Sequence, residues 1–244
     1  MASSLVVERV HGSGAVLFSE GRTERVSCTW ATTINIALTG RIEVENEHSV
    51  VRGSIVITPP GVRRISRSRG PVLSILLDAD LHRASRSALP VDRSFELESA
   101  DLVARASTLV STHTSSVMAD AELLAGRLMP LGRAPLRDPR LEWAMAAMAA
   151  GAMGPRPLRA VARAVGLSAP HFSEHFSATV GLPLKRWLLW QRVRRSLRLM
   201  AEPLSVGHIA IDAGFSDQPH MTKTYADWLG YTPGKLAGVL GRRR

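Results

Sequence analysis

The chain has 244 residues and a formal net charge of +10, from 31 basic and 21 acidic side chains, so it is long enough for one or two domains. It contains no run of about 18 apolar residues and no signal-peptide pattern at its N-terminus, so we expect a cytoplasmic protein that does not enter a membrane. Cys28 is the one cysteine, which excludes an internal disulfide and a cysteine zinc cluster.

The N-terminal part of the sequence predicts short strands. Between residues 5 and 77, segments rich in Val, Ile, Leu and Thr alternate with Gly and Pro clusters. Such spacing is typical of a small antiparallel barrel or sandwich. After Asp78 the apolar residues take helical spacing, over 80–89 and about 96–129. The second segment has more apolar residues than one face needs, so we expect Leu109 and Val110 to pair two monomers.

One strand pair resembles the second motif of cupin barrels. Gly53, Pro59 and Gly61 match that motif, but Arg64 stands where metal-binding cupins have a histidine. His48 stands alone, so the imidazole ligands that oxygenase or isomerase chemistry needs are missing, and we expect a pocket without a metal or cofactor. An anionic effector is favoured by Arg63, Arg64, Arg67 and Arg69, although the acidic residues of 43–47 can equally neutralise them.

The composition changes between the two halves of the chain. Three prolines and a glycine between Pro130 and Pro139 predict an interdomain linker, and helical spacing continues from residue 139 to the end. Residues 1–132 carry 14 basic and 14 acidic side chains, whereas residues 133–244 carry 17 and 7. Because Arg and Lys neutralise phosphates, this asymmetry favours DNA binding by the second half, although basic residues also serve solubility or contact with an anionic membrane.

Residues 158–180 and 205–230 repeat one pattern. A short apolar-periodic segment is closed by a glycine (Gly166, Gly214), a capping Ser168 or Asp217 follows, and a second helix comes after it. This arrangement indicates two helix–turn–helix units in tandem. An i, i+4 spacing predicts the buried faces of the two second helices, formed by Phe172, Phe176, Met221 and Tyr225.

A helix is predicted between the two copies, over about 183–202. Its apolar face carries Trp187 and Trp190, and its other face is rich in arginine. At 1.5 Å per residue such a helix is about 28 Å long, near the ~34 Å between successive major-groove faces of DNA. Arg194 and Arg195 are candidates for phosphate contacts, with an ordinary solvated helix face as the alternative.

The two copies and their spacing resemble the AraC/XylS family of transcription regulators over about 138–240. The second copy carries the resemblance most clearly, in Ile209-Ala210, Gly214–Asp217, Lys223–Tyr225 and Gly230–Pro233. The resemblance implies base contacts from the early exposed positions of each second helix, which are Pro170, Ser173 and Glu174, then Gln218, His220, Thr222 and Lys223. Gln bonds adenine and Lys donates to guanine, while Glu174 either accepts from cytosine or repels phosphate.

The sequence therefore predicts an α+β protein of two domains. Residues 1–132 are expected to form a cupin-like β-barrel with helices, for effector binding and dimerisation, and residues 133–244 an all-α domain of two helix–turn–helix units joined by a linker helix. The resemblance implies an activator of the AraC type that binds double-stranded promoter DNA, acts with RNA polymerase, responds to an unknown small-molecule effector and forms a homodimer. We expect no catalytic residue; the alternative is a metal-independent cupin enzyme fused to a DNA-binding tail.

Overall fold

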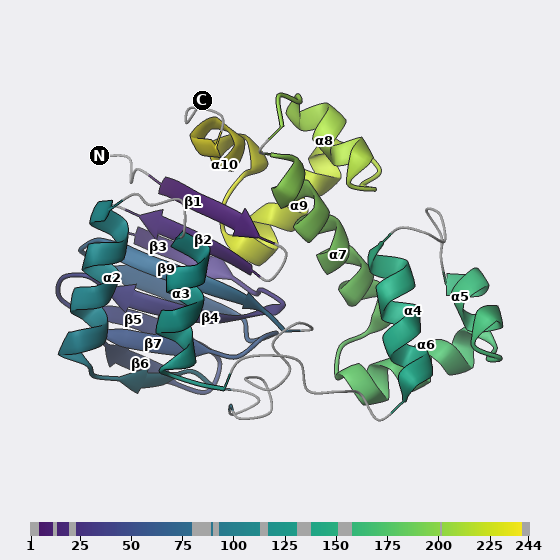
Figure 1. Ribbon diagram of the computed structural model, residues 1–244, viewed down its shortest axis with the longest axis horizontal. Helices are drawn as coiled ribbons and strands as arrows, with labels where there is room; N and C mark the ends of the chain where they lie inside the picture. The colour runs from purple at the N-terminus through teal and green to yellow at the C-terminus, as the bar shows by residue number, and fades with distance from the viewer. Residues whose placement is uncertain are drawn as a thin grey trace.

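The chain forms strands first and helices afterwards. The computed structural model describes residues 5–11, 14–19, 23–79, 89, 93–112, 117–130, 138–150, 158–200 and 202–240. Figure 1 follows these residues from an N-terminal part made mainly of β-sheet to a C-terminal part made of helices. The predicted order of α and β elements is confirmed.

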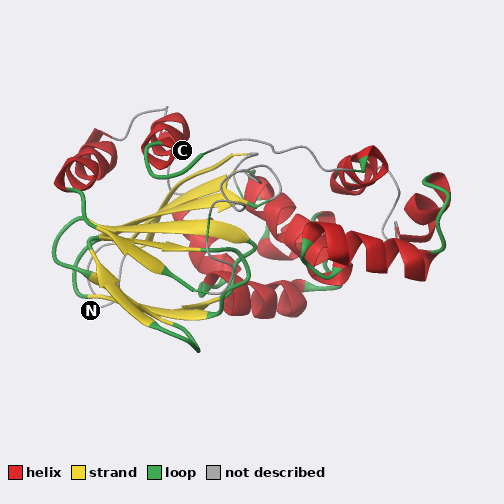
Figure 2. Cartoon of the chain, turned by 90° about the horizontal axis from the view of Figure 1, so that it is seen from below, coloured by secondary structure: helices red, strands yellow, loops and turns green. Residues whose placement is uncertain are grey.

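The strands pair antiparallel into two sheets, drawn in yellow in Figure 2. They are β1 (Leu5–His11), β2 (Gly14–Ser19), β3 (Thr23–Ser27), β4 (Ala31–Ala37), β5 (Ile42–Glu45), β6 (Val50–Gly53), β7 (Ile55–Thr58), β8 (Arg64–Ser68), β9 (Val72–Asp78) and β10 (Phe95–Leu97). The six-stranded sheet has the order β1-β2-β9-β4-β7-β10, and the four-stranded sheet has the order β3-β8-β5-β6.

The six-stranded sheet is covered on both faces, and strand β4 shows why. All seven of its residues are buried. Ile34 and Ile36 pack in the cluster that contains residues of the covering helices. The alternate residue Thr33 faces the four-stranded sheet, where its hydroxyl accepts a hydrogen bond from Arg64 at 2.8 Å. The space between the sheets is therefore partly polar, with a small apolar cluster that includes Val44 and Val56, and the larger apolar cluster of this sheet lies under the helices.

Helices α2 (Ala100–Thr112) and α3 (Val117–Gly126) lie over the six-stranded sheet (Figure 1). The segment 96–129 predicted as helical therefore begins as strand β10 and continues as two helices; residues 80–88 of the other predicted segment lie outside the described residues. Leu109 is buried in the core beneath α2. The expectation that Leu109 pairs two monomers is therefore wrong, because its side chain packs within its own chain.

The predicted closed barrel is also corrected. Among the described strands, β1, β10, β3 and β6 are the edges of two separate sheets. Helix α10 (Pro233–Leu240) packs against β1, and helix α9 (Gln218–Leu229) packs against β3. Covering an edge with a helix is one way in which proteins shield its unpaired backbone groups. The apolar spacing predicts strands, but it does not report which strands pair.

The remaining helices are α4 (Pro139–Ala149), α5 (Leu158–Ala164), α6 (Ala169–Val180), α7 (Leu184–Leu199) and α8 (Val206–Asp212). The predicted linker falls on residues 131–137, which lie outside the described residues, as does the predicted domain boundary. Helix α7 is the predicted helix between the two copies, and its 16 residues span about 24 Å.

The two parts of the chain pack directly against each other. Leu17 and Leu76 of the six-stranded sheet and Trp30, just before β4, share one buried cluster with Trp187 and Trp190 of α7. The backbone N–H of Cys28 donates to the carbonyl of Trp228 at 3.1 Å. The Arg25 guanidinium donates to the Tyr231 hydroxyl and lies 4.7 Å from the centre of that ring. The described contacts thus tie the sheets to α7 and α9.

Candidate nucleic-acid interface

The first helix pair consists of α5 and α6. Gly166 ends α5 with a φ of 74°, a left-handed conformation that favours glycine, so the turn predicted there is confirmed. Ser168 is the N-cap of α6, and its hydroxyl accepts a hydrogen bond from the backbone N–H of His171 at 3.4 Å. Helix α6 thus begins where the sequence predicts a recognition helix.

The second helix pair, α8 and α9, repeats the same device. Gly214 has a φ of 91°, and the Asp217 carboxylate accepts a hydrogen bond from the backbone N–H of His220 at 2.7 Å. This cap is the shorter of the two and is charge-assisted. Pro219 lies in the first turn, where a missing N–H costs no helical hydrogen bond.

Both candidate recognition helices are anchored on α7 by their buried faces. The rings of Phe176 and Trp187 meet edge-on with their centres 5.4 Å apart. The Tyr225 hydroxyl is 2.7 Å from the hydroxyl of Ser196, and burial raises the pKa of this tyrosine despite that hydrogen bond. Phe172 and Met221 are also buried, so the predicted inner faces are confirmed. The opposite faces are left to solvent.

The outward face of α6 carries few donors. Pro170 and Glu174 are exposed. Ser173 is half-buried, and its hydroxyl donates to the Ala169 carbonyl of its own helix at 2.9 Å. Its oxygen is left with acceptor capacity toward a base edge. Among the predicted positions of this helix, Glu174 therefore presents the longest polar side chain.

The outward face of α9 carries more donors. Gln218 and Lys223 are exposed, and Thr222 is half-buried. His220 is held in place, because its Nδ1 lies 3.0 Å from the Ser216 hydroxyl and its ring meets Phe215 edge-on at 5.3 Å. The hydrogen bond at Nδ1 leaves Nε2 as the ring nitrogen that can reach a base. The four predicted side chains lie within two turns of one helix.

Helix α7 carries the predicted phosphate contacts, but the structure gives them different surroundings. Arg195 is half-buried, and no described ion pair involves it. The side chain of Arg194 is 18% exposed and forms an ion pair with Asp78, at the end of β9, at 3.1 Å. Burial, followed by the charges of Arg194 and Arg195, lowers the pKa of Arg198. Three arginines therefore gather at one place on α7.

An ion pair that the sequence analysis missed joins α6 to the start of α4. Asp138 caps α4, and its carboxylate lies 2.9 Å from the Arg140 guanidinium and 3.0 Å from Nε2 of His175. These two partners, with Arg140 the stronger, hold the pKa of Asp138 well below its usual range. The N-cap signal of Asp138 before Pro139 is visible in the sequence, whereas its contact with His175 is not.

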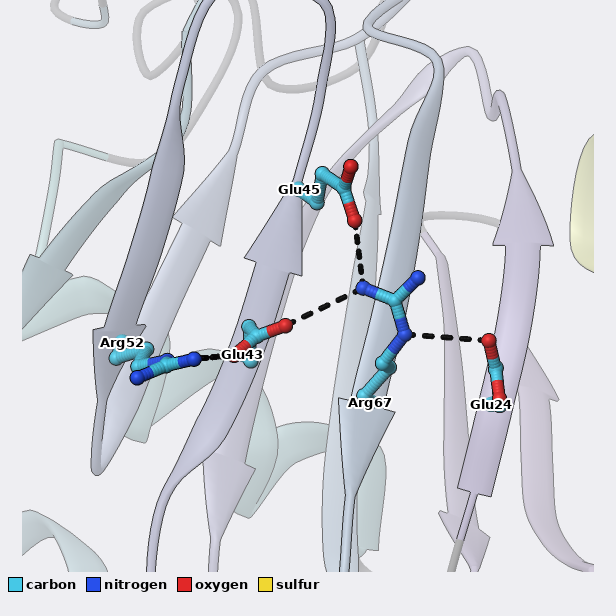
Figure 3. A network of polar contacts seen from close by, with 5 residues as sticks. All are labelled: Glu24, Glu43, Glu45, Arg52 and Arg67. Atoms are coloured by element: carbon cyan, nitrogen blue, oxygen red, sulfur yellow. Dashed lines mark hydrogen bonds and ion pairs between the residues drawn. The ribbon is translucent and has the colours of Figure 1, made fainter.

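The four arginines considered for an anionic effector have three different kinds of surroundings. Arg67 lies on the outer face of the four-stranded sheet, where it forms ion pairs with Glu24, Glu43 and Glu45 (Figure 3). These acidic side chains raise the pKa of Arg67, so neutralisation, the alternative considered for this residue, is confirmed. Arg63 and Arg69 are exposed.

Arg64 points between the two sheets and is only 3% exposed. Its guanidinium donates to the Thr33 hydroxyl at 2.8 Å and to the Val62 carbonyl at 3.3 Å, and no described carboxylate pairs with it. Burial, followed by the charge of Arg25, lowers the pKa of Arg64 to about 10. The position that holds a metal-binding histidine in cupins thus holds a buried cation.

Metal binding and membrane insertion also bear on the site. In the described part of the chain, no three His, Cys, Asp or Glu side chains come close enough together to hold a metal ion. None of the described helices is both long and apolar enough to cross a membrane.

Comparison with known proteins identifies the C-terminal part. A family model described as a helix-turn-helix domain matches residues 161–238, which contain the end of α5 and all of α6, α7, α8 and α9. The Msm operon regulatory protein of Streptococcus mutans is 30% identical over 77 residues, which make up 31% of this chain and 28% of that protein. The match thus spans a little over a quarter of the length of that relative.

Solved structures share the fold over almost the whole chain. An apo variant of ToxT from Vibrio cholerae has a TM-score of 0.64 at 10% identity, covering 95% of this chain and 99% of that one. Wild-type ToxT with a bound unsaturated fatty acid has a TM-score of 0.62 at 10% identity, covering 95% and 97%. At this identity the likeness shows the fold, a β-sheet part joined to a helix–turn–helix part. The C-terminal part thus matches a helix-turn-helix domain model and the chain shares the fold of ToxT, which fits the resemblance of residues 138–240 to the AraC/XylS family.

Proposed function

We propose that this chain is a transcription regulator of the AraC type that binds double-stranded promoter DNA through α6 and α9. The observation that carries the proposal is the pair of capped helices, each anchored on α7 by its apolar face with its polar face exposed. Helix α7 spans about 24 Å of the ~34 Å that separates successive major-groove faces, so it supplies most of the offset that two recognition helices on one side of the duplex need.

Helix α9 provides the larger share of base readout in this proposal. Gln218 bonds an adenine edge, Lys223 donates to guanine, and His220 presents Nε2 from a position fixed by Ser216. Thr222 contacts the same groove. Helix α6 contributes through Pro170, Ser173 and Glu174, and Arg195 on α7 contacts a phosphate. Each close base contact of this kind discriminates against a wrong base by about 1–3 kcal/mol.

The N-terminal part binds a small anionic effector in this proposal. Among the buried N–H groups without a hydrogen-bond partner in the described residues are Arg25 Nε, Arg64 Nε and Asn35 Nδ2. All three are donors, and a buried donor left unpaired costs about 1–3 kcal/mol. Arg64 and Asn35 lie on strands of the two facing sheets, so an acceptor-rich ligand between the sheets, such as the carboxylate of a fatty acid like the one bound by ToxT, satisfies them.

The oligomeric state and the role in transcription are proposed from the resemblance to the AraC/XylS family. On that basis we propose a cytoplasmic homodimer that activates transcription together with RNA polymerase. With Leu109 buried in its own chain, the dimer contact lies elsewhere on the molecule. No observation favours the alternative of a metal-independent enzyme, because the buried residue at the cupin metal position is a cation held by Thr33 and Val62.

Binding of the full-length protein to DNA tests the first part of the proposal. Fluorescence anisotropy compares DNA from upstream of the neighbouring genes with random DNA of equal length, over a range of salt concentrations. We expect preference for one upstream segment and a steep loss of affinity with salt, because bound phosphates release counterions. Lys223→Ala should relax the preference at one or two base pairs. Affinity that is flat with salt, or equal for all sequences, would overturn the DNA assignment.

Thermal unfolding with added ligand tests the effector separately. Oleate and octanoate are the probes, with dodecanol as an uncharged control. We expect the acids to raise the Tm of the wild type and of Arg69→Gln, whose side chain is exposed, but not that of Arg64→Gln. An equal response from Arg64→Gln would refute the anionic pocket and leave the DNA assignment untouched.

A further inference from the structure

Asp78 is a buried carboxylate of the sheets that reaches into the DNA-binding part. It is the last residue of β9 and is 2% exposed. Its Oδ2 accepts a hydrogen bond from the Trp190 indole N–H at 2.7 Å and lies 3.1 Å from Nε of Arg194. Both partners are on α7, more than a hundred residues further along the chain. The position of Arg194 is further fixed by its bond to the Gln191 side chain at 3.0 Å.

Arg194 belongs to a cluster of like charges. The charges of Arg194 and Arg195 both act on Arg198, whose pKa they lower together with burial. Arginines at neighbouring positions of one helix repel one another, so an anion beside them is stabilised. Asp78 supplies that anion from the other part of the chain. A DNA phosphate has the same charge and forms the same type of hydrogen bond with a guanidinium.

We propose that Asp78 masks Arg194 from DNA, as an internal substitute for a phosphate. With its side chain 18% exposed, Arg194 has little surface left for a second anion while the pair with Asp78 is intact. Arg195 is one residue away and remains available. The chain therefore has two DNA-binding strengths, one with the sheets docked on α7 and a higher one with Asp78 withdrawn. The proposal rests on DNA binding by the helical part.

The position of Asp78 depends on the strands around it. β9 lies between β2 and β4 in the six-stranded sheet, and Asp78 pairs with Ala31. β9 also carries Ser74, and β4 carries Asn35. The Ser74 hydroxyl donates to the Asn35 side-chain oxygen at 2.7 Å between the sheets. Ser74 and Asp78 therefore lie on the same face of β9, four residues apart. This continuity links the masking contact to the proposed effector site.

The variant Asp78→Asn tests the masking with little change of shape. An amide keeps an oxygen that accepts from the Trp190 indole, but it removes the charge that holds Arg194. We expect the full-length variant to bind random DNA several-fold more tightly at low salt. The slope of log affinity against log salt should steepen by about one, as one added phosphate contact requires. Near-UV circular dichroism and urea unfolding establish that the variant is folded.

Two further variants identify the arginine. Adding Arg194→Gln to Asp78→Asn should abolish the gain, whereas adding Arg195→Gln should lower affinity in both backgrounds and leave the gain in place. A gain that survives Arg194→Gln would overturn the proposal, because it would come from a loosened interface. An unchanged salt slope in folded Asp78→Asn would overturn it as well.

Arg194→Gln alone keeps the proposal testable if Asp78→Asn does not fold. Masking predicts an unchanged salt slope for this variant, whereas an arginine already on a phosphate predicts a slope shallower by about one. The latter result would refute masking. A wild type that binds no DNA at all would instead refute the proposed function on which this inference rests.

Discussion

Gly230, where α9 ends, should be the glycine whose replacement costs most. Its φ is 70°, and its N–H donates to the carbonyls of Tyr225 and Ala226 at 3.1 Å. A Cβ at this position would lie 2.2 Å from Cγ of Arg25 and 2.7 Å from the backbone oxygen of Val26. Gly230→Ala therefore combines a strained backbone with a collision between the helical part and β3.

A matched position separates these two effects. Gly166 ends α5 with a φ of 74°, but a Cβ there would meet nothing within 4 Å. Gly166→Ala should therefore lower the unfolding free energy by only about 1–2 kcal/mol, the cost of placing a side chain in the left-handed conformation. Gly230→Ala should lose this amount and, in addition, the roughly 1–3 kcal/mol typical of overpacking, because the backbone of Val26 has to move.

Urea unfolding of both full-length variants measures the difference. Intrinsic fluorescence follows the interface, because Trp190 and Trp228 stack there with ring centres 5.8 Å apart. We expect Gly230→Ala to unfold at lower urea than Gly166→Ala and to lose part of the native tryptophan signal before the main transition. Equal losses would refute the close approach of β3 to α9 as a restraint on the DNA-binding part.

Three further changes probe the candidate interface. Asp217→Ala should cost about 1 kcal/mol in urea unfolding, because it removes the cap of α9, whereas Asp227→Ala on the exposed face should cost far less. Asp138→Ala should lower the free energy of unfolding at neutral pH. Because the fold lowers the pKa of Asp138, the carboxylate stabilises the protein above its ordinary pKa of about 4, and this stabilisation is lost as the pH falls through the lowered pKa. The stabilities of wild type and variant should therefore converge in acid. Glu174→Ala should weaken binding to the specific site alone if the carboxylate accepts from a cytosine, and should strengthen binding to every sequence if it repels phosphate. Affinities for specific and random DNA decide between these results. No change in either affinity would remove Glu174 from the interface.

Features set by neighbouring residues could be predicted from the sequence. The glycine turns at Gly166 and Gly214, the caps at Ser168 and Asp217 and the buried faces of both recognition helices are all where the sequence places them. Each depends on residues within one or two turns of helix, so the backbone geometry and the apolar period determine them locally. Strand segments could be recognised for the same reason, from their β-branched residues and turn signals.

Pairings between distant segments could not be predicted in this way. Apolar spacing identifies strands without naming their partners, so a barrel was expected where two open sheets are found, each with one edge covered by a helix. The number of apolar residues in 96–129 did not reveal that Leu109 packs between α2 and the six-stranded sheet of its own chain. Arg64 and Arg67 look equivalent in the sequence, yet one is buried between the sheets and the other is surrounded by three carboxylates.

The sequence by itself determined that this chain carries two capped helix pairs on a basic helix, the observation from which DNA binding is proposed. Only the tertiary structure decided which of its charges are available for binding. Arg194 reads as a phosphate contact in the sequence, but in the fold it lies against Asp78, and the neighbouring Trp190 bonds the same carboxylate across 112 residues of chain. Nothing in the local pattern encodes such a contact, because the packing of the sheets on α7 brings the two segments together and removes that charge from water.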